Sequence, residues 1–578
     1  MSINKIEQHP FLFVFLLWAF FFVSFACFKI DSVTPVSYIA AMAFFGTFSY
    51  LFAKQKEKIR KIPKENQKAL LCMLAGVIYA GIMMYTFDHV RSSPAIRSRN
   101  DIVPFLFLTV AVIAYSIYIS IRKKRCEKRI ILVIILFSSI IHLFFLMSSK
   151  FNLSQWDMGG FFSGGGGHDG YIEYLYDNNL IPAQFDPRLK WQFYHPPLHY
   201  LIEAFLLKLQ SWCGIDIRTA VNNIQYPPVL YTMISTVCSY LIFKEMKLKK
   251  TGLICATAVA AFSPAFIFVG EFCNNDMLAW MFTFLCILYT LRWYKNPTAK
   301  NILKIGLFFG LGMLSKMSVA LIAPSIAIIF LYSLIKKLIL KDKKTFWKYF
   351  GQMCAFLGLA APLSLYWYVR NFIRFGVPFG YIPKSELEMQ YISDPIAKRL
   401  FDFSPKLFAY PYFHEVEFGN TFNEYNPIIA LLKTSASDTG LVRFQFGLWM
   451  GYVTLWTTVI VALIAFVFMI YAIFSQNSFD DIIYKFFWSL TYVVYLLSYE
   501  CFCIKYPYTC TEQVRYAMPL IIIGALFIGL GLKEVLNKKI KILVCFGYFA
   551  VVSVMLFSLT SVFVFTYYGI YTTLAFML

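Results

Sequence analysis

The feature that most constrains this chain is a series of apolar blocks, each about 17 to 25 residues long and separated by short polar segments. A helix of that length crosses the roughly 30 Å of hydrocarbon in a bilayer. The blocks are continuous rather than alternating, which excludes a transmembrane β-barrel. Only 15% of the residues are charged, whereas soluble domains keep about 25%. The sequence therefore predicts an all-α polytopic membrane protein.

Basic residues gather in the short segments between blocks, at 53–68, 122–129, 244–250, 336–344 and 533–541. The positive-inside rule places such segments on the cytoplasmic side. The net charge of +22 is thus explained by topology, and no nucleic-acid-binding motif accompanies it, so no nucleic-acid partner is expected. We expect an integral protein of a bacterial plasma membrane.

Alternation across the membrane predicts about fifteen spanning helices and two large outer loops. The helices are expected near 10–28, 36–53, 69–87, 102–121, 129–149, 225–243, 251–270, 277–293, 303–316, 318–338, 350–368, 449–473, 485–502, 517–533 and 541–566. The first block lacks a small-residue cleavage site and is interpreted as a retained helix, not a signal peptide. A tight outer hairpin is expected at Ser315 and Lys316, because one continuous helix there would place the basic segment 336–344 outside.

Four regions follow from this topology. They are an N-terminal four-helix transmembrane extension at 1–128, a core at 129–368 with an outer loop at 150–224, an outer segment at 369–446, and C-terminal helices at 447–578. Within the first outer loop, 196–212 has apolar residues at helical spacing and two prolines at its start. This pattern is typical of a helix lying along the membrane surface.

Asp157 lies in the motif WDMGGF, shortly after the predicted span 129–149. A carboxylate at that point could act as a general base on an acceptor hydroxyl, or it could be a solvated turn residue. The glycines at 159, 160 and 164–167 allow backbone conformations that a side chain would block. The loop could close over a substrate or simply be flexible.

Four residues of the same loop could ligate a divalent metal: His168, Asp169, His195 and His199. Their spacing matches no compact metal motif, so a metal is the weaker interpretation. The two prolines after His195 would hold that histidine in a defined position. His168 and His195 are also predicted substrate-binding residues.

Further polar residues fall at the outer ends of predicted helices. Asn275 and Asp276, after Glu271, stand at the start of the predicted span 277–293, where they could cap the helix or orient a sugar or a metal. Lys316, Arg370, Arg374 and Arg515 also lie on the outer side, against the positive-inside bias. Such cations could snorkel to the interface or converge on a phosphate group, whose oxygens a guanidinium binds in pairs.

Three cysteines, Cys501, Cys503 and Cys510, lie near the outer side, where an oxidising environment permits disulfides. Either Cys503–Cys510 or Cys501–Cys510 is possible. Most of the other cysteines fall in apolar blocks, where a thiol acts as a small apolar side chain.

Five motifs occur in an order that resembles a known group of proteins. They are WDMGGF, YHPPL, GLGMLSKMS, YWYVRNFIRFGVPFGY and EQVRYAMPL, within 129–566. The combination resembles protein O-mannosyltransferases and bacterial lipid A aminoarabinose transferases of the GT-C superfamily. The resemblance implies a GT-C-like helical bundle, a polyprenyl-phosphate sugar donor and transfer on the extracytoplasmic side by direct displacement with inversion.

Site residues follow from the same resemblance. Asp157 falls on the family's catalytic first-loop carboxylate, and His195 falls on its His-Pro-Pro-Leu turn. Arg370 and Arg515 occupy places expected to contact the donor phosphate. The sequence departs from the pattern at Met158, where the family has a second acid. Asp169 could replace that acid, or could itself be the base; we favour Asp157.

The predicted function is thus a membrane glycosyltransferase that moves a sugar from a polyprenyl-phosphate donor to a lipid, protein or glycan hydroxyl. A transporter or flippase of lipid-linked sugars is the alternative, and a non-catalytic scaffold is a third possibility. A transporter would need charges buried along a path through the helices. Here the polar groups cluster at one face and in two outer loops, which favours an enzyme.

Overall fold

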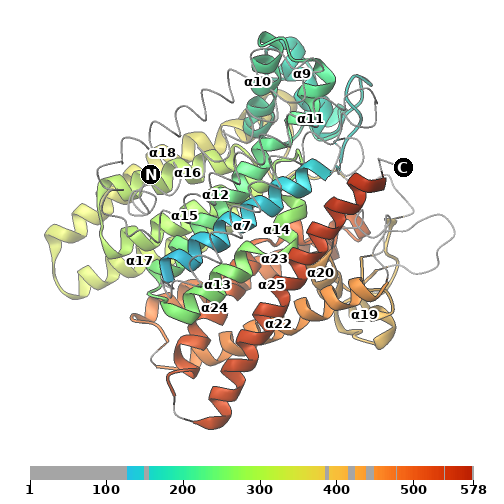
Figure 1. The fold of residues 1–578 in the computed structure, drawn as a ribbon. Coiled ribbons are helices and arrows are strands. Elements are labelled where there is room, and N and C mark those ends of the chain that lie inside the picture. Colours follow the sequence, from blue (N-terminus) through green and yellow to red (C-terminus); the bar gives the residue numbers. More distant parts are fainter. Residues whose placement is uncertain are drawn as a thin grey trace, which may run out of the picture.

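The computed structural model describes residues 127–575, except 149–150, 152–154, 156, 384–389, 414–423, 438–447, 477 and 539. Within these ranges the chain forms helices and two isolated β-bridges, and no strand (Figure 1). This confirms the predicted all-α class. The four helices predicted before residue 127 lie outside the described residues, so the predicted extension at 1–128 stays a prediction.

The long helices follow the predicted spans closely. They are α7 (Glu127–Ser148), α12 (Tyr226–Glu245), α15 (Asp276–Lys295), α16 (Ala299–Met313), α17 (Ala323–Ile339), α18 (Lys343–Phe375), α22 (Leu448–Phe474), α23 (Ile482–Lys505), α24 (Pro519–Val535) and α25 (Lys541–Ala575). Seven helical stretches in the described ranges are long and apolar enough to cross a membrane. The expected hairpin at Ser315 and Lys316 is present, between α16 and the short helix η3 (Met317–Ile322).

Three spans differ from the prediction, and the simplest difference is that α25 continues past residue 566 to Ala575. The span expected at 251–270 is two helices, α13 (Lys250–Ala261) and α14 (Pro264–Val269). Pro264 explains the break, because proline disfavours a helical conformation in the residue before it and starts a helix well. The span expected at 350–368 is extended at both ends into α18, a helix of 33 residues that contains Pro362.

Close backbone packing holds the bundle together. A Cβ on Gly252 of α13 would lie 2.5 Å from the carbonyl oxygen of Gly529 on α24, so only glycine allows these two helices to touch at that point. Small residues at helix crossings are the usual means of packing in membranes, where lipid gives no hydrophobic drive for association. The crossing fixes α24, whose N-terminal end lies next to the site described below.

The connections divide between two ends of the bundle. The basic segments 244–250, 336–344 and 533–541 all connect helices at one end. At the opposite end lie the end of α7, the start of α15, the α16–η3 hairpin and the end of α18. Because successive helices run in opposite directions, the basic segments and the predicted site residues lie at opposite ends of the bundle.

A small helical cap covers that second end. It consists of α9 (Gly167–Asn178), η2 (Pro187–Leu189), α10 (Leu198–Trp212) and α11 (Ile217–Asn223), which gather at the top of Figure 1. The cap has its own apolar core, with Tyr171, Ile172, Phe193, Tyr200 and Leu207 fully or almost fully buried. The helix predicted at 196–212 is α10. The apolar core of the cap also includes Ile224 and Cys273, so it packs the outer loop against the membrane bundle.

The second outer segment contains α19 (Ile396–Phe401), η5 (Pro405–Phe408) and α20 (Pro427–Ala436). The short helices η6 (Thr509–Thr511) and η7 (Val514–Tyr516) follow α23. Arg399 of α19 is buried and donates to Glu512 at 2.9 Å, which ties the outer segment to the chain just before Arg515. Neither possible disulfide forms in the described residues, because Cys501 and Cys503 are free thiols.

Candidate functional site

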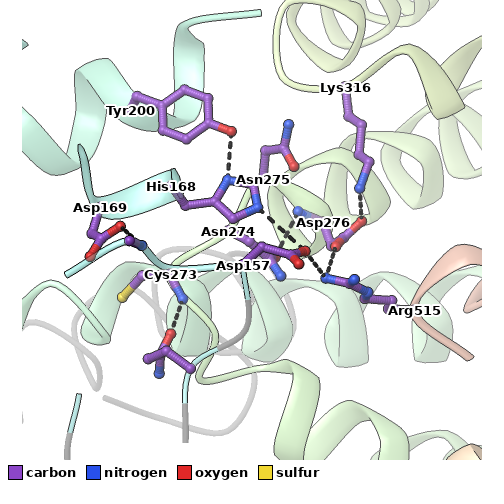
Figure 2. A network of polar contacts seen from close by, with 12 residues as sticks. Asp157, His168, Asp169, Tyr200, Cys273, Asn274, Asn275, Asp276, Lys316 and Arg515 are labelled. Carbon is purple, nitrogen blue, oxygen red and sulfur yellow. Dashed lines mark hydrogen bonds and ion pairs between the residues drawn. The ribbon is translucent and has the colours of Figure 1, made fainter. Parts of the chain in front are cut away.

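Asp157 occupies a strained position in the first outer loop. Its φ is +60°, in the left-handed region that residues with a side chain adopt sparingly. Its carbonyl oxygen accepts a hydrogen bond from the backbone N–H of His168, which holds the backbone in this conformation. The side chain turns toward the bundle, where Oδ2 accepts from Nη1 of Arg515 at 2.8 Å (Figure 2). Strained residues concentrate at functional sites.

The glycine run forms the loop that presents Asp157. A Cβ on Gly159 would lie 2.1 Å from the carbonyl oxygen of Gly166, and Gly167 has a φ of +92°. The two ends of the loop meet in an antiparallel bridge between Met158 and Gly167. The glycines are therefore required by close packing of the loop on itself, and the loop is a compact turn.

Asp169 holds this turn closed. Its Oδ1 accepts from the backbone N–H groups of Gly159 and Gly170, and its Oδ2 accepts from Gly160 at 2.6 Å. The residue is fully buried, at 0% exposure. Both oxygens thus have backbone partners, and a buried carboxylate with this arrangement is poorly placed to reach a substrate hydroxyl. Of the two carboxylates, that of Asp157 is partly exposed and that of Asp169 is not.

Asp276 is the first residue of α15 and contacts two cations. Its Oδ1 accepts from Lys316 Nζ at 2.5 Å, and its Oδ2 lies 4.0 Å from Nη1 of Arg515. Carboxylates are favoured at a helix N-terminus because the helix dipole is positive there. Asn274 caps the helix, since its Oδ1 accepts from the backbone N–H of Asp276 at 3.0 Å.

Together these contacts make a chain of charges, Asp157–Arg515–Asp276–Lys316 (Figure 2). Four separate segments supply it: the glycine loop, η7, the start of α15 and the α16–η3 hairpin. Along this chain of charges the side chains are 26%, 4%, 1% and 15% exposed, in the order given. Its two end residues are therefore open to a ligand, and the two middle residues are buried. The two carboxylates and the two cations together carry no net charge.

Neighbouring groups fix the two cations. The indole N–H of Trp280 on α15 donates to the carbonyl oxygen of Arg515 at 2.9 Å, which anchors η7 to the bundle. The ring of Tyr516 lies beneath both cations, 4.9 Å from the Arg515 guanidinium carbon and 5.4 Å from Lys316 Nζ. Stacking on an aromatic face stabilises a buried cation without neutralising it.

Two histidines border the charge chain. His168 Nε2 lies 4.0 Å from Asp157 Oδ2, and the rings of His168 and His195 stack with centroids 5.8 Å apart. Burial first, and then the positive charge of Lys316, lowers the pKa of both imidazoles well below the usual value. Both rings are therefore neutral at physiological pH and contribute hydrogen-bonding groups, not charge.

Asn275 and Arg370 have other surroundings. The amide of Asn275 donates to the carbonyl oxygen of Ser315 at 2.9 Å, so it holds the hairpin that carries Lys316 and does not cap α15. Arg370 donates to the carbonyl oxygen of Pro182 and stacks on Trp367 at 4.7 Å. It borders a groove on α18 with Ala361, Pro362, Leu365, Tyr366 and Val369. None of the contacts found for it reaches the charge chain, and its predicted role in phosphate binding stays a prediction.

The possible metal ligands do not converge. Among the residues that the structure describes, no group of three or more His, Cys, Asp or Glu side chains is arranged to hold a metal ion. His168 Nδ1 faces the hydroxyl of Tyr200, and Asp169 is occupied by backbone donors. His199 instead lies beside Glu203, with 3.7 Å between Nδ1 and Oε1.

Sequence reasoning missed three participants. Tyr200 contacts His168, Asn274 caps α15, and Gln155 ties the outer loop to the chain before α15 through the backbone of Cys273 and Glu271. The pairing of His199 with Glu203 could have been found, because i and i+4 lie on one face of a helix. The Tyr200–His168 contact has no local signal, since it joins two helices through tertiary packing.

Residues 194–367 match the family model described as dolichyl-phosphate-mannose-protein mannosyltransferase. This confirms the predicted resemblance over less than a third of the chain, a segment that includes His195, Asn275, Asp276 and Lys316. Among solved structures, the crystal structure of ArnT from Cupriavidus metallidurans bound to undecaprenyl phosphate is similar, with 14% identity and a TM-score of 0.30. That similarity covers 69% of this chain and 79% of the other. No curated protein sequence matches the chain.

Proposed function

We propose that this chain, with its protein-mannosyltransferase segment at 194–367, is an inverting membrane glycosyltransferase that uses a polyprenyl-phosphate-linked sugar. The acceptor is a hydroxyl group of a lipid, protein or glycan. The observation that carries the proposal is the chain of charges Asp157–Arg515–Asp276–Lys316. It places a partly exposed carboxylate beside buried and half-buried cations, which are the groups that such a transfer needs.

Asp157 acts as the general base in this proposal. It takes the proton of the acceptor hydroxyl as that oxygen attacks the anomeric carbon of the donor sugar. The bond between the anomeric carbon and the phosphate oxygen breaks at the same time, so the configuration inverts. The polyprenyl phosphate leaves with the bonding electron pair, and the proton on Asp157 passes to solvent.

Lys316 and Arg515 stabilise the negative charge that develops on the leaving phosphate. Preorganised cations in a water-poor site are effective because they need no reorganisation as the charge appears. Asp276 contacts both cations and holds them in position when no donor is bound. Lys316, at the open end of the charge chain, is the first cation that an incoming phosphate meets.

The transfer takes place on the extracytoplasmic side of the membrane. Support comes from the distribution of basic residues, which lie in the segments 244–250, 336–344 and 533–541 at the end of the bundle opposite Asp157. The positive-inside rule assigns that basic end to the cytoplasm. A donor anchored in the outer leaflet has its phosphate near the depth of the helix ends that carry Asp276 and Lys316.

The experiment uses the full chain in lipid nanodiscs, a panel of radiolabelled polyprenyl-phosphate sugars and a membrane extract as acceptor. Wild type, Asp157→Asn and Asp169→Asn are compared, each with and without a chelator of divalent metals. We expect Asp157→Asn to lower turnover by about a hundredfold to ten-thousandfold, which is the rate enhancement that a general base typically contributes. Asp177→Asn, an exposed carboxylate on α9, is the matched control and should retain turnover.

Other outcomes lead to different conclusions. Full activity of Asp157→Asn together with loss in Asp169→Asn would make Asp169 the base. Loss of activity with the chelator would introduce a metal into the mechanism. If no donor is turned over while labelled lipid crosses a bilayer that contains the protein, the chain is a flippase and the proposal is wrong.

A further inference from the structure

Tyr200 has the only hydroxyl found against His168 in the described residues, and the proposed mechanism leaves it without a role. We propose that Tyr200 is a positioning residue that fixes the tautomer of His168, so that His168 presents an Nε2–H to Asp157. This inference rests on the proposed function for its catalytic consequence. The tautomer itself can be measured without turnover.

Tyr200 is held rigidly. It is fully buried on α10, and its ring stacks on Tyr171 of α9 with centroids 4.2 Å apart and an angle of 24°. Tyr171 stacks in turn on Phe193, at 4.5 Å and 14°. A fully buried phenol at the end of such a stack cannot swing away, so its hydroxyl keeps one direction. That direction is toward Nδ1 of His168, at 2.7 Å.

His168 lies between Tyr200 and Asp157. Its ring is 2% exposed, its Nδ1 faces the Tyr200 hydroxyl, and its Nε2 lies 4.0 Å from Oδ2 of Asp157. The gap of 4.0 Å is longer than a hydrogen bond, so the contact is an electrostatic one in this state. Figure 2 shows the three side chains in line, with the imidazole between the phenol and the carboxylate.

The neutral ring has two tautomers, and the surroundings distinguish them. If Nδ1 carried the proton, the lone pair of Nε2 would face the carboxylate of Asp157, which is repulsive. If the Tyr200 hydroxyl donates to Nδ1, the proton is on Nε2 and its positive end faces the carboxylate. Burial of the ring, followed by the positive charges of Lys316 and Arg515, disfavours a second proton, so the ring stays neutral.

The consequence concerns the two oxygens of Asp157. Among the described residues, the two groups found against its carboxylate, Arg515 and His168, both face Oδ2. Oδ1 is thereby left to accept the proton of the acceptor hydroxyl. His168 neither gains nor loses a proton in this scheme. Tyr200 acts through His168 to select which oxygen of the base is used.

The first test compares Tyr200→Phe with Tyr171→Phe. Both substitutions remove one hydroxyl from the same buried stack, but the Tyr171 hydroxyl has no hydrogen-bond partner. We expect Tyr200→Phe to lower kcat by about tenfold with KM for donor and acceptor unchanged, the effect of one lost hydrogen bond. Tyr171→Phe should leave kcat and KM at their wild-type values. Equal effects of the two variants would assign Tyr200 to packing alone.

A second test uses coupling between Tyr200 and His168. The side-chain amide of a glutamine can offer an N–H near the position of Nε2 without needing a tautomer. We therefore expect His168→Gln to keep part of the activity, and Tyr200→Phe to have no further effect in that background. Additive effects of the two substitutions would overturn the inference.

The tautomer can be observed directly with ¹⁵N-labelled histidine in nanodiscs. The correlations of each ring nitrogen with the ring protons distinguish the two neutral forms, and His168→Gln identifies the signal of His168. We expect Nε2–H in wild type and Tyr171→Phe, and a mixture of forms in Tyr200→Phe. Nδ1–H in the wild type would refute the inference. The spectra decide this even if no sugar donor is turned over, a result that would count against the proposed function alone.

Discussion

Nη1 of Arg515 donates to Oδ2 of Asp157 at 2.8 Å, across 358 residues of sequence. The pair joins the first outer loop to the segment before α24, and Asp276 extends it toward Lys316. A buried ion pair gains little net stability, but removal of one partner leaves a charge uncompensated and is costly. The arrangement thus makes the position of Asp157 depend on the far end of the chain.

Substitution of Arg515 tests that dependence. Arg515→Ala leaves Asp157 and Asp276 without the cation between them, and we expect a loss of about 3 to 5 kcal/mol in the stability of the folded protein. Arg515→Lys keeps the charge, so stability should be largely kept. The ammonium lacks the planar fork of donors of a guanidinium and cannot hold both Asp157 and Asp276, so turnover should fall. Thermal unfolding in detergent measures the first effect and sugar transfer the second. Lys398→Ala, which removes an exposed pair with Asp394, should change stability by less than about 1 kcal/mol.

Asp169→Asn should open the glycine loop. The amide has one acceptor oxygen in place of two, and its NH₂ group would face a backbone N–H of Gly159 or Gly160. An unsatisfied buried donor costs about 1 to 3 kcal/mol, so we expect faster hydrogen exchange at these two amides and a loss of activity through misplacement of Asp157. Glu173→Gln is the control, because Glu173 accepts from Phe162 on the exposed side of the loop. Unchanged exchange in Asp169→Asn would contradict the assigned role.

Lys316→Ala should weaken binding of the donor. The substitution removes the partly exposed end of the charge chain, and the donor phosphate loses the cation that it meets first. We expect KM for the donor to rise by about tenfold or more, the loss of one charge-assisted hydrogen bond, with a smaller change in KM for the acceptor. Lys316→Arg should recover part of the affinity. Steady-state kinetics with each substrate varied in turn separate the two constants, and equal effects on both would argue against a phosphate contact.

Gly159→Ala should be far more damaging than a glycine substitution in a helix. The added Cβ would lie 2.1 Å from the carbonyl oxygen of Gly166, which is backbone and cannot give way without opening the loop. Gly358→Ala on α18 is the comparison, since nothing lies within 4 Å of the added atom there. We expect Gly159→Ala to abolish transfer and Gly358→Ala to retain it. Activity assays at matched protein levels decide between these outcomes.

The histidine His199 should make the cap less stable in acid. Burial lowers the pKa of His199 to about 4, from 6.5, so the folded cap favours the neutral ring. Its contribution to stability is present above pH 6.5 and is lost as the pH falls toward 4, because the unfolded chain then binds the proton. At pH 5 the loss is about 2 kcal/mol for this one residue. Hydrogen exchange over residues 198–223 between pH 7 and pH 5 measures it, and His199→Asn should reduce the dependence. Burial raises the pKa of Glu203, 3.7 Å from the ring, which shifts the profile in the opposite direction. The His199 contribution is therefore the difference between the two profiles, and identical profiles in wild type and His199→Asn would contradict the prediction.

The membrane helices were predictable because their signal is local. Each predicted span after residue 128 falls on a helix, since about 20 apolar residues in a row have no other stable form in lipid. The break at Pro264 was missed because the apolar run continues through it and conceals the effect of one proline. The hairpin at Ser315 was found only through charge, since the positive-inside rule forbids a single helix there.

The site was predictable in its residue types and only partly in its geometry. Asp157, Asp276, Lys316 and Arg515 were each selected for a polar position at one face of the membrane, and the fold brings these four together. Arg370 was selected by the same argument, yet its contacts are with Pro182 of the first outer loop and Trp367 of α18. Sequence order does not say toward which side of a helix end a long side chain turns. The roles of Asp169 and Tyr200 depend on tertiary contacts that no local pattern encodes.

The place of Arg515 in the chain also has a consequence for biosynthesis. A ribosome completes the glycine loop and α15 long before it reaches η7, so the carboxylates of Asp157 and Asp276 are made before Arg515. Only when α23 has entered the membrane and the segment behind it has folded back against Trp280 does the guanidinium arrive between them. The ion pairs that hold Asp157 and Asp276 at Arg515 can therefore form only after α23 and η7 have been made.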